Sequence, residues 1–392
     1  MTAFNFKGEL PGSKSMLNRA LIALSYNPDI KIVGDSDCDD VRLMQQGLAD
    51  LFSGRTVDCG HAGTVLRFLA LRASRIPGSH KLKGSERLFQ RPHQELLQIL
   101  GQLGVDAKWQ SGSITIVSRG WRLMVDGLQV NSERSSQFAS SVVLNSWGLK
   151  SPLHFHVSRK IVSEDYFRMT LKMMRFLGLR IESNGSEFFI AANQYAKSQK
   201  ILIEQDLSSA FVVAALAAVS GRAEIQNFPK VSLQPDFVFV SILEKMKINI
   251  QKNEDQLLVL QTPEWQGVTA HIESSPDLFP VLGVLCALAQ SESIISGVGH
   301  LQYKESSRLL RTTELIEKLG AQVRINNDQV KINPTPLKPQ DVPAFSFDSD
   351  QDHRMAMAAI VARQAGYKVN LNNRAVVSKS FPELAKLVEA SQ

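Results

Sequence analysis

The sequence predicts an α/β fold built from repeated units, and three observations support this prediction. A helical stretch with apolar residues three and four positions apart recurs, each time followed by a break and two short alternating strands around a polar turn. The copies follow one another at intervals of about 70 residues, which indicates a structural repeat. Between them lie helical stretches that are apolar on almost every side and are therefore expected to be buried.

Four copies of the helix, break and hairpin pattern are clear, at residues 95–117, 169–191, 241–261 and 314–333. In three of them a glycine stands at the break, where left-handed backbone is expected: Gly104, Gly178 and Gly320. Two shorter pieces, residues 43–60 and 383–392, resemble degraded or truncated copies. Six units of roughly 65 residues each would then account for the whole chain.

Two apolar segments predict buried helices that begin with a capping residue. Asp206 opens the segment 206–221, and Ser275 opens the segment 275–290. A chain of 392 residues is long enough for two domains, and no Pro- or Ser-rich linker divides it. The best boundary by composition lies near Glu204 and Gln205.

The composition is that of a globular protein, with 44% hydrophobic and 21% charged residues, and it excludes several classes of function. A net charge of +6 suits anionic partners, but 7% aromatic residues and the lack of a binding module argue against nucleic acid. Three cysteines without a C-x-x-C pair argue against a disulfide framework or a cysteine zinc site and favour a cytoplasmic location. The longest apolar stretch, 278–289, is too short to cross a bilayer, so we expect no membrane association.

The segment LPGSKSMLNR, residues 10–19, predicts an anion site at the start of a helix. A Pro-Gly turn precedes two hydroxyl groups, on Ser13 and Ser15, and two cations, Lys14 and Arg19. A nucleotide P-loop requires glycine directly before the lysine, and Ser13 breaks that pattern. The segments CGHAGTVLRF (59–68) and RSSQF (134–138) are further candidate turns at helix starts.

In the C-terminal half, carboxylates and cations gather in four short motifs. These are SPDLFP with Asp277, YKESSR with Lys304, Glu305 and Arg308, QDHRMAMA with Asp352, His353 and Arg354, and SKSFP with Lys379. Asp277 and Glu305 beside several cations are suited to proton transfer on a phosphorylated substrate, because cations bind the phosphate while the acids exchange protons. His154 and His156 lack a third ligand, so we expect no metal site there.

Taken together, the motifs resemble the 3-phosphoshikimate 1-carboxyvinyltransferase (5-enolpyruvylshikimate-3-phosphate synthase) family of enolpyruvyl transferases. Eleven motifs follow the family's order between Leu10 and Pro382: LPGSKSMLNR, DDVRLM, HAGTVLR, RLFQRP, SSQF, SEDY, DLSSA, PDLFP, YKESSR, DHRMAMA and SKSFP. The resemblance implies two similar domains, each of three βαβαββ repeats around buried helices, with the active site in the cleft between them. It places an N-terminal domain at 13–204, mainly the shikimate 3-phosphate side. A C-terminal domain at 1–12 and 205–392 would complete the phosphoenolpyruvate site.

The resemblance also implies the reaction, which is transfer of the enolpyruvyl group from phosphoenolpyruvate to the 5-hydroxyl of shikimate 3-phosphate with release of phosphate. It implies a monomer that acts in chorismate and aromatic amino acid biosynthesis, needs neither metal nor organic cofactor, and is a target of glyphosate. The catalytic residues that it implies are Asp277 as proton acceptor, Glu305 as proton donor, and Lys14. The implied shikimate 3-phosphate ligands are Lys14, Ser15, Arg19, Ser135, Ser136, Gln137, Ser163, Tyr166, Asp277 and Lys304. The implied phosphoenolpyruvate ligands are Lys14, Gly63, Arg91, Gln137, Arg308, Arg354 and Lys379.

Two alternatives remain open at this point. The related UDP-N-acetylglucosamine enolpyruvyl transferases share fold and donor, but they carry a catalytic cysteine in a loop whose counterpart here, residues 83–92, has none. A non-catalytic paralogue that binds phosphorylated metabolites is the other alternative. It is suggested by four departures from the family's usual residues: His61, His300, Gln302 and Ser307.

Overall fold

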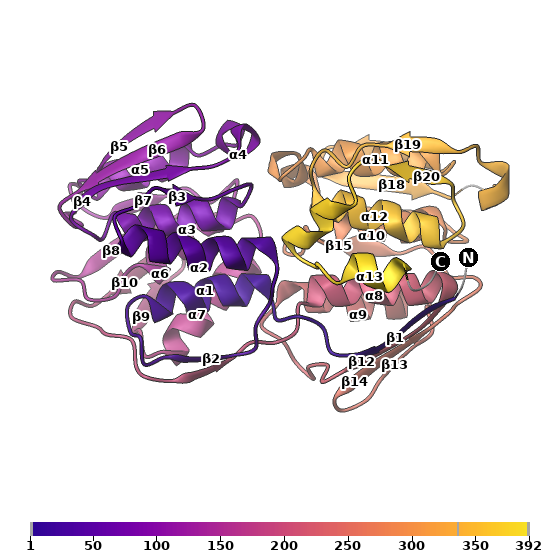
Figure 1. Cartoon of the computed structure of the whole chain (residues 1–392), viewed down its shortest axis with the longest axis horizontal. Helices are drawn as coiled ribbons and strands as arrows, with labels where there is room; N and C mark the ends of the chain where they lie inside the picture. The colour runs from indigo at the N-terminus through magenta and orange to yellow at the C-terminus, as the bar shows by residue number, and fades with distance from the viewer. Residues whose placement is uncertain (1–2, 335–336, 390–392) are drawn as a thin grey trace. The chain divides into compact units, whose positions relative to one another are not determined.

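The computed structural model describes residues 3–334 and 337–389, and the chain forms two compact units. Unit 1 comprises residues 1–11 and 204–392, and unit 2 comprises residues 12–203. Each of the two boundaries between the units lies one residue before the domain boundary expected from the sequence. In Figure 1, unit 2 runs from indigo to magenta, and unit 1 includes the orange and yellow end of the chain.

Unit 2 contains two complete βαβαββ repeats. The first consists of β3 (Val57–Asp58), α3 (Gly63–Ala73), β4 (Gly78–Lys83), α4 (Glu86–Gln90), α5 (Gln94–Gln102), β5 (Asp106–Gln110) and β6 (Ser113–Ser118). The second consists of β7 (Leu128–Val130), α6 (Gln137–Leu144), β8 (Leu153–Val157), α7 (Glu164–Phe176), β9 (Ile181–Asn184) and β10 (Glu187–Ile190). Their sheets have the orders β3-β4-β6-β5 and β7-β8-β10-β9, in which a parallel pair is followed by an antiparallel hairpin.

Unit 1 contains two complete repeats with the same topology. One consists of β1 (Phe4–Gly8), α8 (Leu207–Ser220), β12 (Gly221–Gln226), η1 (Pro235–Val238), α9 (Phe239–Lys245), β13 (Ile250–Lys252) and β14 (Gln256–Leu260). The other consists of β15 (Thr269–His271), α10 (Phe279–Ala287), β16 (Ser293–Ser296), η2 (Gly299–Tyr303), α11 (Arg308–Lys318), β17 (Gln322–Asn326) and β18 (Gln329–Asn333). Because β1 pairs in parallel with β12, the N-terminal residues belong to unit 1.

The third repeat of each unit is reduced, which corrects the expectation of three full βαβαββ repeats. In unit 2, α1 (Lys14–Leu24) and α2 (Asp39–Phe52) accompany a two-stranded parallel sheet of β2 (Lys31–Val33) and β11 (Lys200–Leu202). Unit 1 has β19 (Phe345–Phe347), α12 (His353–Gln364), β20 (Val369–Leu371) and α13 (Leu384–Glu389), with the 3₁₀ turns η3 (Pro339–Asp341) and η4 (Ala375–Lys379). Within the described residues, neither third repeat carries the closing hairpin.

The four predicted helix and hairpin segments are confirmed, and so are the glycines between helix and strand. Gly104, Gly178 and Gly320 have φ of +69°, +98° and +96°. The piece at 43–60 covers the end of α2 and all of β3, and it therefore spans the end of one repeat and the start of the next. The piece at 383–392 contains α13, and its last three residues lie outside the described part of the chain.

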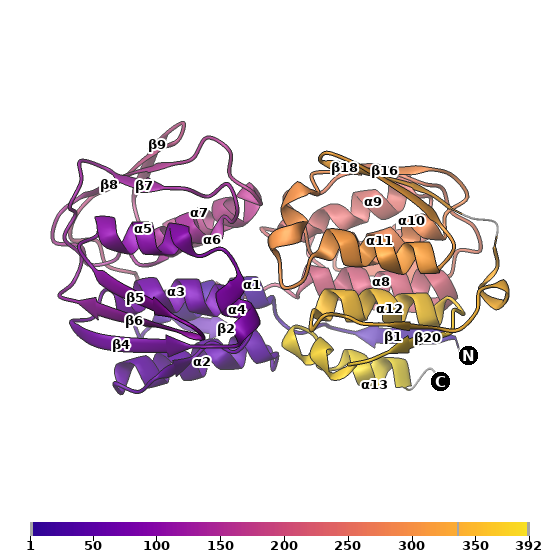
Figure 2. The same cartoon turned by 90° about the horizontal axis from the view of Figure 1, so that it is seen from above.

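Of the two predicted buried helices, one begins where expected and one does not. The Asp206 carboxylate caps α8 by accepting a hydrogen bond of 2.9 Å from the backbone N–H of Ser209, and α8, α10 and α12 all contribute to the unit 1 core. The helix expected from Ser275 begins only at Phe279. Ser275 instead donates its hydroxyl to the carbonyl of Pro235, and Pro280 occupies the first turn of α10, where its missing N–H costs nothing. In Figure 2, α8, α10 and α12 lie between the sheets of unit 1.

Candidate active site

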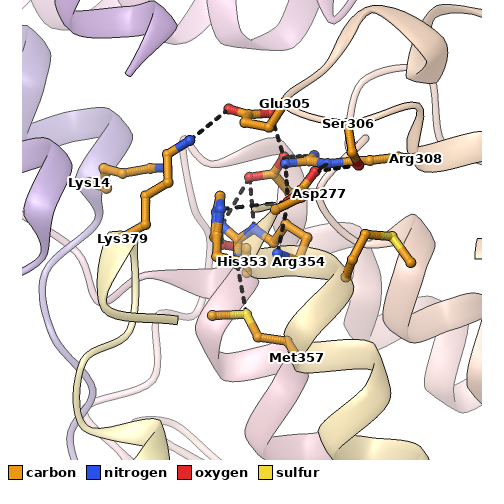
Figure 3. Close-up of polar contacts among 12 residues, drawn as sticks. Lys14, Asp277, Glu305, Ser306, Arg308, His353, Arg354, Met357 and Lys379 are labelled. Carbon is orange, nitrogen blue, oxygen red and sulfur yellow. Dashed lines mark hydrogen bonds and ion pairs between the residues drawn. The ribbon is translucent and has the colours of Figure 1, made fainter. Parts of the chain in front are cut away.

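The predicted residues of the C-terminal half gather in unit 1 in what we call the acid–base cluster. It is formed by side chains from four separate segments: Asp277, Glu305, Arg308, Asp352, Arg354 and Lys379. All of these except Asp352 are labelled in Figure 3. Asp277 lies in the turn before α10, and Glu305 lies between η2 and α11. The arginines stand in the first turns of α11 and α12, and Lys379 ends η4.

Arg308 is the centre of this cluster. Its side chain is 1% exposed, and its Nε donates to Asp352 Oδ2 at 2.8 Å. Nη1 donates to Asp277 Oδ1 at 2.6 Å, and Nη2 donates to Glu305 Oε2 at 3.0 Å. Burial opposes the charge on Arg308, but the carboxylates of Asp352, Asp277 and Glu305 outweigh it and raise its pKa well above the usual value. One buried guanidinium therefore binds both proposed proton-transfer groups.

The other two cations bind the same two carboxylates from their opposite sides. Arg354 donates from Nη2 to Asp277 Oδ2 at 2.9 Å and to the Ser208 hydroxyl at 2.6 Å. Lys379 Nζ lies 3.5 Å from Glu305 Oε1. Burial disfavours the charge on Arg354, but Asp277 and other nearby carboxylates raise its pKa. Three carboxylates thus face three cations in a largely buried cluster, and an incoming anion must compete for these cations.

The predicted residues of the N-terminal half lie in unit 2. Lys14, at the start of α1, forms an ion pair with Asp40 of α2, with Nζ and Oδ2 3.1 Å apart and both side chains largely buried. Arg19 is buried between the rings of Phe68 and Tyr166, and it donates to Thr170 Oγ1 at 2.7 Å. Burial lowers the pKa of Arg19 to about 10, and Tyr166 acts in the opposite direction. Arg19 therefore stays charged at neutral pH.

Sequence reasoning missed Arg67, which joins three predicted segments of unit 2. Its Nη1 donates to Gln137 Oε1 at 2.7 Å and to the Ser135 hydroxyl at 3.2 Å, and its Nη2 donates to the carbonyl of Pro92. Gln137 in turn donates to Thr64 Oγ1 at 2.9 Å. The available signal was the position of Arg67 in HAGTVLR, one helical turn after Gly63. This spacing places both residues on the same side of α3.

Gly63 provides the space that the Arg91 side chain occupies. A Cβ atom at Gly63 would lie 2.7 Å from Arg91 Nη1, closer than real Cβ atoms approach, and 3.1 Å from Arg91 Cζ, which is a tight contact. Any larger residue at this position must therefore displace the guanidinium. This contact gives a physical reason for glycine here.

Three of the remaining predicted residues, Ser15, Ser136 and Ser163, lie at helix starts, and Lys304 follows a 3₁₀ turn. Ser136 is the N-cap residue of α6, and Ser163 is the N-cap residue of α7 with a left-handed φ of +55°, unusual for a residue other than glycine. Ser15 accepts a hydrogen bond at its carbonyl from Arg19 Nη1 at 2.8 Å. Lys304 directly follows η2 and precedes Glu305.

Of the four residues that differ from the family's usual ones, three lie close in the sequence to residues of the acid–base cluster. His300 is buried within η2, and Gln302 donates to the carbonyl of Gly299 at 3.0 Å. Ser307 is the N-cap residue of α11 but makes no side-chain capping bond. His61 is exposed in the turn before α3. None of the four replaces a carboxylate or a cation of the acid–base cluster.

His93 lies two residues after Arg91 and is held uncharged by its surroundings. Its Nε2–H donates to the carbonyl of Leu88 at 2.8 Å, and its ring packs against Trp109 with centroids 5.0 Å apart. Burial, assisted by the charge of Arg67, lowers its pKa from 6.5 to about 2. The unfolded chain therefore takes up a proton below pH 6.5 that the folded chain does not accept until about pH 2, so this residue lowers stability as the pH falls through that range.

We expect this effect to appear as acid sensitivity. Between pH 7.5 and pH 5, the wild-type free energy of unfolding should fall by about 2 kcal/mol more than that of a His93→Gln variant. Urea denaturation at the two pH values measures this difference. The exposed His154→Gln variant is the control and should follow wild type. Equal pH dependence of wild type and His93→Gln would contradict the assignment.

In the part of the chain that the structure describes, no three His, Cys, Asp or Glu side chains are placed to hold a metal ion. The rings of His154 and His156 are 4.7 Å apart, and His156 Nδ1 lies 3.7 Å from Glu187. Within the same described residues, no helix has the length and apolar character needed to cross a bilayer.

Comparisons of sequence and of structure with known proteins both find EPSP synthases. The family model described as EPSP synthase (3-phosphoshikimate 1-carboxyvinyltransferase) matches residues 52–387. A 3-phosphoshikimate 1-carboxyvinyltransferase of Methanosphaerula palustris is 33% identical over 95% of this chain and 93% of its own length. The one of Trichormus variabilis is 27% identical over 96% and 93%.

Solved structures show the fold. The EPSP synthase of Acinetobacter baumannii matches with a TM-score of 0.75 at 18% identity, covering 100% of this chain and 96% of that one. The enolpyruvyl transferase NikO of Streptomyces tendae matches with a TM-score of 0.73 at 14% identity, covering 100% and 95%. The chain therefore has the two-domain enolpyruvyl transferase fold.

Proposed function

This chain belongs to the 3-phosphoshikimate 1-carboxyvinyltransferase (EPSP synthase) family, and from that membership we propose how its residues carry out the family's reaction. The enzyme transfers the enolpyruvyl group of phosphoenolpyruvate to shikimate 3-phosphate, a step of the shikimate pathway to aromatic amino acids. We propose that it acts in the cytoplasm as a monomer on these two small substrates. Family membership supports this part of the proposal.

In chemical terms, C3 of phosphoenolpyruvate gains a proton while the 5-hydroxyl oxygen of shikimate 3-phosphate loses one and bonds to C2. The resulting tetrahedral ketal then breaks its C2–O bond to phosphate and gives up a proton from C3, which restores the double bond. One acid and one base are needed in each of these two reaction steps, addition and elimination. We assign the base of the addition step to Asp277 and the acid to Glu305.

The shared guanidinium of Arg308 is the observation that carries this assignment. Because Nη1 binds Asp277 and Nη2 binds Glu305, the two carboxylates are fixed next to each other, as concerted proton uptake and release require. Both are held by cations here, which favours their ionised forms. Glu305 must carry a proton before it can act as the acid.

We propose that phosphoenolpyruvate itself brings about that change. Its carboxylate and phosphate would take over donors of Arg354 and Lys379, which bind Asp277 and Glu305 in this structure. Loss of Lys379 and approach of a negative substrate both favour protonation of Glu305. Withdrawal of Arg354 exposes an oxygen of Asp277, which can then accept the hydroxyl proton.

The remaining substrate contacts are proposed from unit 2. Hydroxyl and amide groups at the start of α6, from Ser135, Ser136 and Gln137, would bind shikimate 3-phosphate at the end of the helix whose dipole favours negative charge. The other proposed shikimate 3-phosphate ligands in unit 2 are Lys14, Ser15, Arg19, Ser163 and Tyr166. Unit 1 would contribute Asp277 and Lys304. Phosphoenolpyruvate would be bound by residues of both units. Unit 2 would contribute Lys14, Gly63, Arg91 and Gln137, and unit 1 would contribute Arg308, Arg354 and Lys379.

The test is phosphate release by the purified protein given phosphoenolpyruvate with shikimate 3-phosphate, alongside UDP-N-acetylglucosamine as the alternative acceptor. We expect phosphate release when shikimate 3-phosphate is the acceptor and none when UDP-N-acetylglucosamine is the acceptor. We expect the Asp277→Ala variant to release no phosphate with either acceptor. Asp255→Ala, which removes an exposed carboxylate from the hairpin of β13 and β14, is the matched control. Release with the sugar nucleotide would overturn the acceptor. Folded protein that binds shikimate 3-phosphate without release would instead indicate a binding paralogue.

A second prediction concerns Gly63. The Gly63→Ala variant should raise KM for phosphoenolpyruvate by about tenfold or more, because the new methyl group displaces the Arg91 guanidinium and one charge-assisted hydrogen bond is lost. The control is Gly101→Ala in α5, where an added Cβ meets nothing within 4 Å. Steady-state kinetics measure both, and an unchanged KM in Gly63→Ala would contradict the role of Arg91.

A further inference from the structure

A cavity of about 690 Å³ lies in unit 2 at the opposite ends of α3 and α6 from the proposed site. The site residues Gly63 and Gln137 stand at the first positions of these helices. The cavity is lined by the segments that follow their last residues, together with the loop between β6 and β7. The strands β4 and β8, labelled in Figure 1, begin beside it. Eleven helical residues span about 16 Å, so the cavity is separate from the substrate residues.

Every charged residue that lines this cavity is a cation: Arg75, Arg119, Arg122 and Lys150. Arg75 is fixed in place, because its Nη2 donates to the carbonyls of Trp147 and Gly148 at 2.8 and 3.3 Å. Arg119, Arg122 and Lys150 are exposed, and among the described residues none of the three forms an ion pair with a carboxylate. A concave surface lined by one sign of charge concentrates counter-ions. The cavity therefore attracts anions.

The rest of the lining is largely apolar and includes one well-fixed aromatic ring. The Trp121 indole N–H donates to the Ser74 hydroxyl at 2.7 Å, and the Arg75 guanidinium lies 5.0 Å from the centre of the Trp121 ring. Leu123 and Leu149 add aliphatic surface. Ser74 is held in turn, because Ser118 donates to its carbonyl at 2.5 Å. An inorganic ion alone would leave this apolar wall without a partner.

We propose that this cavity is a second binding site, for a small organic anion that carries a phosphate or carboxylate group on an apolar body of about the size of one ring. A volume of about 690 Å³ falls in the range of small-molecule sites. The guanidinium groups of Arg119 and Arg122 bind the anionic group, since guanidinium pairs with phosphate and carboxylate in a two-pronged manner. Trp121 and the leucines contact the body.

Phenyl phosphate is the probe, and isothermal titration calorimetry is the measurement. Titrations into wild type are made with shikimate 3-phosphate at saturation, so that the residues assigned to this substrate are occupied. The residues assigned to phosphoenolpyruvate are the same in all three proteins, so binding there cannot distinguish the variants. Inorganic phosphate and phenol, which each carry one half of the probe, are titrated in the same way. The test variant is Arg119→Gln/Arg122→Gln. The matched control is Lys81→Gln/Arg180→Gln, which removes two exposed charges of unit 2 outside the cavity.

We expect one molecule of phenyl phosphate to bind wild type and the control equally, and the test variant about tenfold or more weakly. Inorganic phosphate and phenol should each bind wild type more weakly than phenyl phosphate does. Equal binding to all three proteins, or no binding to wild type, overturns the proposal. Inorganic phosphate that binds as tightly as phenyl phosphate shows a simple ion site and overturns the class of ligand. All four substituted side chains are exposed, so folding is preserved, and thermal denaturation verifies this.

Discussion

Replacement of Arg308 by methionine should lower the free energy of unfolding by about 3–5 kcal/mol and abolish enolpyruvyl transfer. The side chain is 1% exposed and binds three carboxylates. Methionine fills a similar volume but leaves these carboxylates facing one another without their shared cation. The side chain of Asp352 is fully buried, so it cannot regain water as compensation.

Urea denaturation at neutral pH measures this loss, and the deficit should shrink as the pH is lowered, because protonation removes the repulsion among the carboxylates. Arg311→Met is the control on the same helix, since Arg311 forms a partly exposed ion pair with Glu314. That change should cost less than about 1 kcal/mol. A stability of Arg308→Met within 1 kcal/mol of wild type would show that the three ion pairs contribute little.

The second large effect is expected from Glu305→Gln, which should lower kcat by about 10²–10⁴. Glutamine keeps the shape of glutamate and can still accept a hydrogen bond from Arg308, but it cannot deliver a proton to C3 of phosphoenolpyruvate. KM for phosphoenolpyruvate should change little, because Arg354 and Lys379 remain.

Phosphate release under saturating substrates gives kcat, and urea denaturation shows whether the fold is kept. Glu314→Gln, which changes a carboxylate on the exposed side of α11, should leave kcat unchanged. If Glu305→Gln turned over within about threefold of wild type, another group would have to supply the proton.

Several features of this protein follow from its sequence alone, because they depend on neighbouring residues. The change from three-and-four spacing to alternation locates each helix and hairpin, as in α5 with β5 and β6, since each periodicity matches one backbone geometry. Gly104 and its counterparts mark the turn because glycine adopts left-handed backbone without steric cost. Asp206 could be identified as a cap because the capping bond reaches only three residues along the chain.

The tertiary structure decided which charges meet. Arg308 pairs with Asp277 and Asp352, which are 31 and 44 positions away, and no local pattern contains that information. Arg67 bonds to Gln137 across 70 positions through the packing of α3 against α6. The start of α10 was misplaced for the same reason, since Ser275 bonds to Pro235, 40 positions away, and not to the helix. The basic cavity is also assembled from loops of separate repeats. Propensity and capping act over a few residues, whereas burial and ion pairing depend on how whole helices and sheets pack, and that packing brings distant parts of the chain together.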